Sequence, residues 1–153
     1  MFTNRIMKLS QKMLNRRTLK TLVYGENDPH NGYGPNKFIR LAQKKLNLNI
    51  FGNGEERRDH IHVSNVAETI YYSMIKNYNG VINAVSNKVI SFKEIANVVK
   101  NNYPGIKIIK NKRNGPMPHN GYRAFNNNLL RKIFPKIRII SLLNWIKIKD
   151  KYI

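Results

Sequence analysis

The sequence predicts an α/β fold, and two observations indicate it. Short apolar runs bounded by Gly, Asn and Pro have the length of β-strands, as between Leu48 and Phe51. Longer segments between them carry apolar residues at helical spacing. The cleanest of these segments opens with a Ser91-x-x-Glu94 capping box, and its apolar residues stand at i, i+3, i+4 and i+7: Phe92, Ile95, Ala96 and Val99.

The first half of the chain predicts one helix, one strand, a loop and a second helix, in that order. Residues 4–17 carry apolar residues near helical spacing and predict the first helix. Residues 19–24 predict a short strand, and residues 25–34 predict a loop rich in Gly, Asn and Pro. Pro35 suits a helix start, because a first-turn N–H has no intrahelical partner to lose. The apolar face of this helix comprises Phe38, Leu41, Ala42 and the stem of Lys45.

The second half predicts further helices. Asn65 and Glu68 form a capping-box pattern, after which Val66, Ile70 and Met74 form one apolar stripe. The elements beyond the Ser91 helix are a strand at 106–109, a loop at 111–121, a short helix at 127–134 closed by Pro135, and a last helix capped by Ser141 that carries Leu142 and Trp145.

The composition is that of one folded domain. The chain has 153 residues and is 41% hydrophobic, which is enough to form a core. It contains no cysteine, so a disulfide framework and a thiolate metal site are excluded, and we expect a cytoplasmic protein. No apolar run is long enough to span a membrane.

The net charge of +20, from 28 Lys and Arg against 8 Asp and Glu, is the most unusual global property. Such a field attracts polyanions, including nucleic acid. The charge is spread evenly, however, and neither a recognition-helix pattern nor an aromatic platform accompanies it. Lys, Asn and Ile are abundant from end to end, which makes the basic stretch 1–17 ordinary for this chain rather than an organelle presequence. Nucleic-acid binding is therefore kept only as a minor alternative.

The most informative segment runs from Phe51 to Ala67 and reads FGNGEERRDHIHVSNVA. A glycine turn is followed by Arg58 and Asp59, a short strand and a helix start, an order that suits a loop presenting a cation to an anionic ligand. The segment resembles the Gly-x-Gly turn and Arg-Asp-x-Ile-His-Val motif of the extended short-chain dehydrogenases/reductases, in the NAD-dependent epimerases and dehydratases of nucleotide sugars. In that family the motif belongs to the substrate-binding half.

Other segments are similar to the same family and follow in its order: VYGEND at 23–28, GPNKFI at 34–39, GVIN at 80–83 and SFKEIA at 91–96. The resemblance implies that residues 23–153 form a nucleotide-sugar substrate-binding region, the C-terminal portion of a Rossmann-type fold without its N-terminal cofactor-binding half. Residues 1–22 are then an N-terminal remnant or a basic helix.

The resemblance also implies NAD(P) for the intact enzyme, held by a Gly-rich turn on a doubly wound domain. No such unit precedes Val23, so we expect this chain alone to bind no cofactor. The family's general base is the Tyr of a helical Tyr-x-x-x-Lys pair. That spacing occurs three times, but Gly34-Pro35 and Pro104-Gly105 interrupt two of the pairs, and Tyr72 with Lys76 lies after the Arg-Asp motif. We therefore assign no catalytic residue and expect the chain to be inactive alone.

The resemblance implies six substrate-binding residues. Arg58 matches the Arg that holds the sugar-nucleotide pyrophosphate, and Arg113 matches a second phosphate contact; a planar guanidinium suits both roles. The other four are Asn36, Lys37 and Phe38, at the helix over the nucleotide, and Phe51, beside the base. The alternatives are a surface ion pair of Arg58 with Glu55 or Glu56, an ordinary first helical turn at 36–38, and a core position for Phe51.

Asp59, His60 and His62 invite a comparison with metal sites. The two histidines share one face of a strand, but Asp59 points to the opposite face, and a metal needs a third ligand. We therefore predict no metal. Asp59 is expected to be a structural hydrogen-bond acceptor, and the histidines are expected to be a partly buried pair satisfied by hydrogen bonds.

These observations predict a substrate-binding fragment of an NAD-dependent epimerase or dehydratase that takes a UDP-, GDP- or dTDP-linked sugar. Three interpretations stay open: a split enzyme completed by a separately encoded Rossmann half, a degenerate relic with residual nucleotide binding, and a basic module that binds nucleic acid or protein. In the first two, a surface that packs on the cofactor half in the family is exposed here and favours association with that half or with a second copy.

Overall fold

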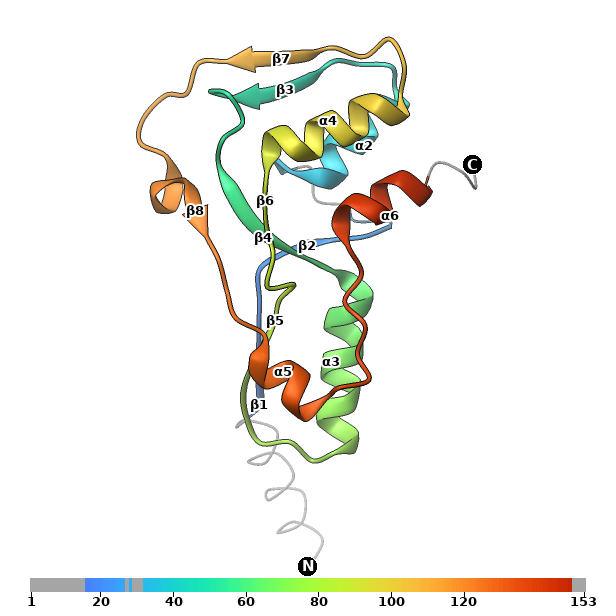
Figure 1. Cartoon of the computed structure of the whole chain (residues 1–153), viewed down its shortest axis with the longest axis vertical. Helices are drawn as coiled ribbons and strands as arrows, with labels where there is room; N and C mark the ends of the chain where they lie inside the picture. Colours follow the sequence, from blue (N-terminus) through green and yellow to red (C-terminus); the bar gives the residue numbers. More distant parts are fainter. Residues whose placement is uncertain (1–15, 27, 29–31, 150–153) are drawn as a thin grey trace, which may run out of the picture.

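The computed structural model describes residues 16–26, 28 and 32–149, which form an elongated molecule (Figure 1). One end holds a two-stranded sheet with helices beneath it, the middle holds a four-stranded mixed sheet, and the other end holds a second two-stranded sheet. Along most of the described chain, pairs of strands are followed by one helix, and the last two helices follow each other directly. The α/β fold class predicted from the sequence is confirmed.

The predicted strand at residues 19–24 is in fact two short strands. β1, Arg16–Lys20, runs parallel to β5, Gly80–Ala84, and β2, Leu22–Tyr24, runs parallel to β4, Arg57–His62. Thr21 separates β1 from β2, and its hydroxyl donates to the carbonyl oxygen of Asp59 at 2.6 Å. The chain therefore passes from one sheet to another at a single residue.

The helix predicted at residues 4–17 lies mostly outside the described residues. Its last two positions, Arg16 and Arg17, belong to β1, where they pair with β5. That part of the prediction is wrong, because strand pairing overrides the local helical spacing. The same pairing makes residues 16–20 of the predicted segment 1–22 part of a sheet rather than a separate basic helix.

The upper region in Figure 1 is built around α2, Pro35–Gln43, and α4, Phe92–Asn102. Pro35 begins α2 as predicted. The capping box of α4 is also confirmed, since the Ser91 hydroxyl accepts from the Glu94 N–H at 3.1 Å and the Glu94 carboxylate accepts from the Ser91 N–H at 2.9 Å. These two starts fix which faces of the helices turn inward.

The strands and the last helix of the upper region complete its core. β3, Leu48–Phe51, pairs in parallel with β7, Ile108–Asn111, and α6, Leu142–Lys149, packs on α4. β7 begins two residues later than predicted, because Ile106 is buried in the core before the strand starts. The buried apolar residues of this region include Phe38, Leu48, Ile50, Ile95, Val99 and Ile146.

β4 is the central strand of the middle sheet. β6, Val89–Ser91, runs antiparallel to β4, and β8, Tyr122–Arg123, runs parallel to it. Both strands pair with the first residues of β4, Arg57 and Arg58. A short 3-10 helix, η1 at Pro118–Gly121, lies within the predicted loop 111–121 and leads into β8. The sheet thus brings the segments around residues 58, 90 and 123 side by side.

The lower region contains α3, Val63–Ile75, and α5, Asn128–Ile133, beside β1 and β5. α3 begins before the predicted cap: His62 is its N-cap, and the His62 Nδ1 accepts from the Ser64 N–H at 3.2 Å. The capping role of Asn65 is wrong, because Asn65 already lies in the first turn. Its side chain instead donates to the Arg138 carbonyl oxygen and accepts from the Ile140 N–H, both at 2.8 Å.

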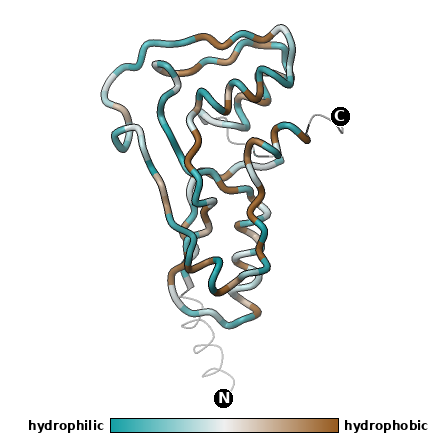
Figure 2. Tube along the Cα trace, in the orientation of Figure 1, coloured by the Kyte–Doolittle hydropathy of each residue, from teal (hydrophilic) through white to brown (hydrophobic). Residues whose placement is uncertain are grey.

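The two faces of α3 carry an unusual distribution of side chains. Its buried residues are polar: Asn65, Thr69 and Ser73. Of the predicted apolar stripe, Ile70 is 45% exposed and Met74 is 55% exposed. Figure 2 shows apolar residues in both the upper and the lower region, but only the upper region buries most of them.

Candidate functional site

The glycine turn before β4 sets the position of the site. Gly54 has φ +71°, and a Cβ there would lie 2.9 Å from the backbone nitrogen of Lys93, so only glycine fits without a shift. The Lys93 N–H donates to the Gly54 carbonyl oxygen at 2.9 Å. The turn is therefore tied to the first residues of α4, and β4 leaves it in a fixed direction.

Arg58 and Arg113, far apart in sequence, meet at the carboxylate of Glu56. Arg58 Nη2 lies 2.5 Å from Glu56 Oε1, and Arg113 Nη2 lies 3.0 Å from Glu56 Oε2. All three side chains are largely buried, with Arg58 only 6% exposed. The alternative of an ion pair between Arg58 and Glu56 is realised, but as a buried two-arginine cluster rather than a surface contact.

The loop after β7 closes over β4 through Arg58. Arg58 Nη2 also donates to the Pro118 carbonyl oxygen at 2.7 Å, and Nη1 donates to the Arg57 carbonyl oxygen at 3.2 Å. Arg123 lies opposite Arg58 in the register of β8 and β4, and its Nη1 lies 3.1 Å from His119 Nε2. The arrangement concentrates positive charge around one buried carboxylate.

Phe51 and Tyr33 form an aromatic wall beside Arg113. The Arg113 guanidinium lies 5.8 Å from the centre of the Phe51 ring, a cation–π distance. Phe51 is 43% exposed, so it does not occupy the core position that is the alternative to a place beside the base. Tyr33 packs on Phe51 and Phe92 at ring-centre distances of 5.2 and 4.3 Å, and its hydroxyl accepts from the Phe51 N–H at 3.4 Å.

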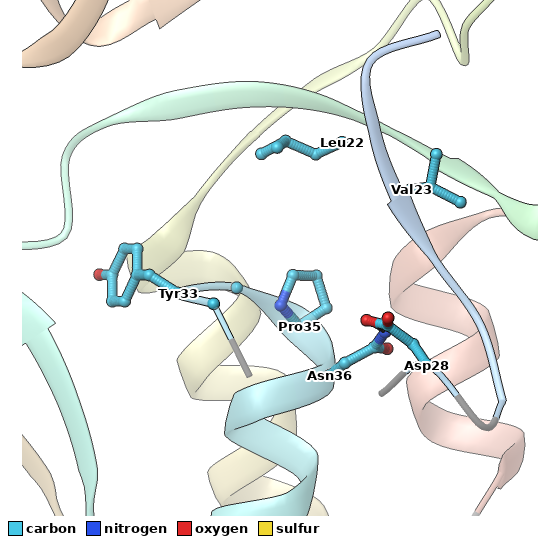
Figure 3. Close-up of a pocket in the computed structure, with 8 residues that line it drawn as sticks. Leu22, Val23, Asp28, Tyr33, Pro35 and Asn36 are labelled. Carbon is cyan, nitrogen blue, oxygen red and sulfur yellow. Dashed lines mark hydrogen bonds between the residues drawn. The ribbon is translucent and has the colours of Figure 1, made fainter. Parts of the chain in front are cut away.

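Tyr33 also joins this cluster to a small hollow. The hollow, of about 80 Å³, is lined by Tyr33, Pro35, Asn36 and Asp28 among others (Figure 3). Figure 3 shows Tyr33 and Asn36 on either side of Pro35, with Asn36 turned toward Asp28. Burial raises the pKa of the Tyr33 hydroxyl to about 12, and the nearby Glu56 also raises it. Tyr33 is therefore a neutral hydroxyl at physiological pH.

Sequence reasoning missed Tyr33 as a site residue. In the sequence Tyr33 stands out only for its spacing to Lys37. In the structure Tyr33 lines the hollow, and its ring packs on Phe51. The available signal was its place directly before the Gly34-Pro35 helix start, because a residue there lies beside the first turn of α2. The sequence indicates Glu56 only as an alternative ion-pair partner of Arg58.

The three predicted residues on α2 have different environments. The Asn36 amide nitrogen donates to Asp28 Oδ2 at 2.6 Å, and the Asn36 side-chain oxygen is 3.5 Å from the Gly25 N–H that donates to it. Lys37 is half-buried at the helix surface. The Phe38 side chain is fully buried, and its N–H donates to the Gly34 carbonyl oxygen, so Phe38 supports the helix from the core.

The side chains after Arg58 serve the fold. Asp59 accepts from the Ser86 and Lys88 N–H groups at 2.9 and 3.2 Å, as expected for a structural acceptor; burial still raises its pKa. Burial lowers the pKa of His60 to about 4, and His62 Nε2 lies 3.4 Å from a Glu26 oxygen. Among the described residues, no three metal-binding side chains cluster together. Nor does any helix in that part of the chain have the length and apolarity needed to cross a membrane.

Comparisons with known proteins agree with the motif. Residues 19–87 match the model of the NAD dependent epimerase/dehydratase family. A sequence search of curated proteins found no match.

Solved structures share the fold. The chain superposes on the UDP-N-acetylglucosamine 4-epimerase of Methanobrevibacter ruminantium in complex with UDP-N-acetylmuramic acid, with a TM-score of 0.70 and 20% identity, covering 96% of this chain and 51% of that one. The UDP-glucose 4-epimerase of Thermotoga maritima with UDP-glucose gives 0.72 and 18%, covering 96% and 52%. The dTDP-glucose 4,6-dehydratase of Bacillus anthracis in complex with NAD gives 0.72 and 16%, covering 96% and 49%.

The chain thus spans about half the length of the solved structures that it matches. Identities of this size support a shared fold alone, here part of a Rossmann-like α/β fold. The match over residues 19–87 agrees with the family resemblance seen in the sequence, and the solved structures agree with a fold of which this chain spans a part.

Proposed function

We propose that the chain binds the diphosphate of a nucleotide sugar through Arg58 and Arg113, as the substrate-binding part of an epimerase or dehydratase. The observation that carries this proposal is their convergence on one carboxylate, that of Glu56. Two guanidinium groups that share one anion are well arranged for a ligand with several phosphate oxygens. The Glu56 carboxylate occupies the position that we assign to such oxygens.

A second observation supports an oxygen ligand at this position. Arg113 Nε is buried and has no hydrogen-bond partner among the described residues. A buried donor left unpaired carries a desolvation cost, which a phosphate oxygen would offset. The exposed ring of Phe51, held beside Arg113 and Tyr33, suits contact with the base or sugar of the same ligand.

Asn36 and Lys37 complete the proposed site from the other side of Tyr33. They lie on the first turn of α2, next to the hollow that Tyr33 lines. The buried Phe38 acts only indirectly, by anchoring that turn in the core. We expect these residues to contact the sugar or nucleoside rather than the diphosphate, and a UDP-, GDP- or dTDP-sugar fits the proposal equally well.

We expect no turnover by the chain alone. The Tyr-x-x-x-Lys pair at the end of α3, Tyr72 with the C-cap residue Lys76, faces α5. The Tyr72 ring lies 6.3 Å from that of Phe134, and Lys76 Nζ donates to the Ile133 carbonyl oxygen at 3.2 Å. The pair therefore lies away from the arginines. NAD(P) chemistry would require a cofactor-binding half, and a cytoplasmic location goes with this proposal.

The lower region supplies a surface for that half. In the described part of the chain β1 pairs only with β5, so its other edge is open to a further strand. Leu19 on β1, Val81 on β5 and Tyr71 on α3 are between 48% and 58% exposed. We propose that the Rossmann half packs here, which buries apolar area worth about 25 cal/mol per Å².

Titration with UDP tests the proposal. UDP should bind the wild type, and Arg58→Ala should weaken binding by about 1.5–3 kcal/mol, the range for a charged hydrogen bond. Arg113→Ala, at a less buried position, should weaken it similarly, whereas Arg131→Ala on α5 should leave it unchanged. NADH should not bind.

A short oligonucleotide, titrated at two salt concentrations, tests the nucleic-acid alternative. Binding to a general polyelectrolyte surface falls steeply with salt and responds to no single arginine. If only the oligonucleotide binds, and Arg58→Ala equals Arg131→Ala, the nucleotide-sugar proposal fails.

A further inference from the structure

Glu56 is the acid at the centre of the arginine cluster, and both of its oxygens are engaged. Oε1 accepts from Arg58 and Oε2 from Arg113, while the carboxylate is about as buried as the arginine it pairs with. It neutralises one of the two positive charges. A diphosphate that uses both guanidinium groups has to compete with this carboxylate.

We propose that Glu56 is an internal anion that holds the site closed and is displaced by the diphosphate, so that it sets the affinity of the site. This inference rests on the proposed function of Arg58 and Arg113. It adds that the chain's own carboxylate occupies the position proposed for the diphosphate, and that removal of that charge increases the affinity for diphosphate.

The surrounding contacts allow the carboxylate to leave without loss of the site. The Glu56 backbone is fixed, because the Phe92 N–H donates to its carbonyl oxygen at 3.1 Å. Arg58 keeps the carbonyl oxygens of Pro118 and Arg57 as acceptors when Glu56 turns away. Arg113 keeps its contact with the Phe51 ring. Only one side chain therefore needs to move.

The neighbouring acid does not share this role. Glu55 is exposed, and its Oε2 accepts from the Asn53 N–H at 2.7 Å within the glycine turn. Hydrogen bonds from backbone N–H groups lower the pKa of Glu55. Glu55→Gln removes the same charge one residue away without changing the bonds of either guanidinium, so it is a matched control for Glu56→Gln.

Isothermal titration of UDP and of inorganic pyrophosphate into wild type, Glu56→Gln and Glu55→Gln tests the inference. Glu56→Gln should bind both ligands at least about 10-fold more tightly than wild type, because the neutral amide competes less well for a guanidinium. Glu55→Gln should change affinity by less than about 2-fold, as expected for a screened surface charge.

The outcomes separate the two proposals. If wild type binds UDP and Arg58→Ala weakens it, but Glu56→Gln binds no tighter than Glu55→Gln, the displacement inference is overturned and the binding site stands. If wild type and a folded Glu56→Gln both bind neither UDP nor pyrophosphate, the proposed function fails and the inference fails with it.

Loss of Glu56 could prevent folding, because it leaves two buried arginines facing each other. In that case the inference is tested on the wild type alone. The side-chain carboxyl carbon of Glu56, followed by NMR, should shift as UDP saturates the site, while that of Glu94 in its capping box stays in place. An unmoved Glu56 signal at saturating UDP would overturn the inference.

Discussion

The α4 helix of the upper region packs through an apolar face, whereas the α3 helix of the lower region packs through a polar face. α4 buries its apolar residues, among them Ile95, Ala96 and Val99. α3 buries Asn65, Thr69 and Ser73 and exposes Ile70 and Met74. Among residues 16–149 as far as the structure describes them, the upper region is therefore closed by the chain's own residues, whereas the lower region leaves an apolar face uncovered.

We propose that the two regions have separate tasks. The arginine cluster lies where β4 leaves the upper region, tied to α4 through Gly54 and Lys93. A closed core holds such a site in place before a ligand arrives. α3 lies in the lower region, away from the start of β4 (Figure 1), so we expect a partner that docks on α3 to leave the arginines uncovered.

The largest expected effect is in the closed core. Phe38→Ala removes a fully buried ring that packs against Tyr33 and Phe92, and we expect a loss of about 3–5 kcal/mol in the free energy of unfolding. Ile70→Ala, on the exposed face of α3, should cost less than about 0.5 kcal/mol. Urea unfolding measures both, and equal losses would contradict the division into a closed and an open region.

The next effect concerns pH. His60 has a folded-state pKa of about 4, lowered by burial from the ordinary value of 6.5. Between pH 4 and 6.5 the unfolded chain therefore binds a proton at His60 that the folded chain does not. The stabilisation that His60 contributes is complete above pH 6.5 and is lost as the pH falls toward 4. The loss amounts to about 3 kcal/mol.

Unfolding of wild type and His60→Asn at several pH values isolates this contribution from those of the carboxylates. The difference between the two proteins should change between pH 6.5 and 4 and stay constant above that range. A constant difference at all pH values would mean that His60 titrates normally in the folded state.

A smaller effect is expected for the polar interior of the lower region. Asn65→Ala removes the side chain that binds Arg138 and Ile140 and leaves both backbone groups without that partner. We expect a loss of about 1–3 kcal/mol. Asn101→Ala, on the exposed surface of α4, provides a comparison at an exposed asparagine. If Asn65→Ala unfolds the chain no more easily than Asn101→Ala, the segment before α6 does not depend on α3.

The smallest effect on stability is expected at the exposed apolar face. Met74→Glu should change the free energy of unfolding by less than about 0.5 kcal/mol, because the side chain is 55% exposed. It should nevertheless reduce self-association and the binding of a cofactor half, both measurable by analytical ultracentrifugation. Unchanged association would show that the partner does not use this face.

The sequence predicted the fold class, the start of α2 and the capping box of α4, because these depend on local chemistry. It did not predict the split at Thr21 or the early start of α3, which depend on pairing with β4 and on the hydrogen bonds of Asn65 to residues 138 and 140. The motif resemblance predicted Arg58 and Arg113 as substrate-binding residues, and this role stays a prediction. Their meeting at Glu56 and the wall formed by Tyr33 could not be predicted, because β4, the loop after β7 and the loop before α2 come together only in the fold.

Hydrogen exchange with and without UDP tests the central claim most directly, namely that a closed upper region carries a diphosphate site while the lower region is open. Without ligand, amides of α4 should exchange more slowly than those of α3 and β1. With UDP, exchange should slow in residues 51–58 and 111–118 and stay unchanged in residues 63–75. Equal exchange rates in both regions would contradict the account. So would a slowing of exchange by UDP that occurs only outside residues 51–58 and 111–118.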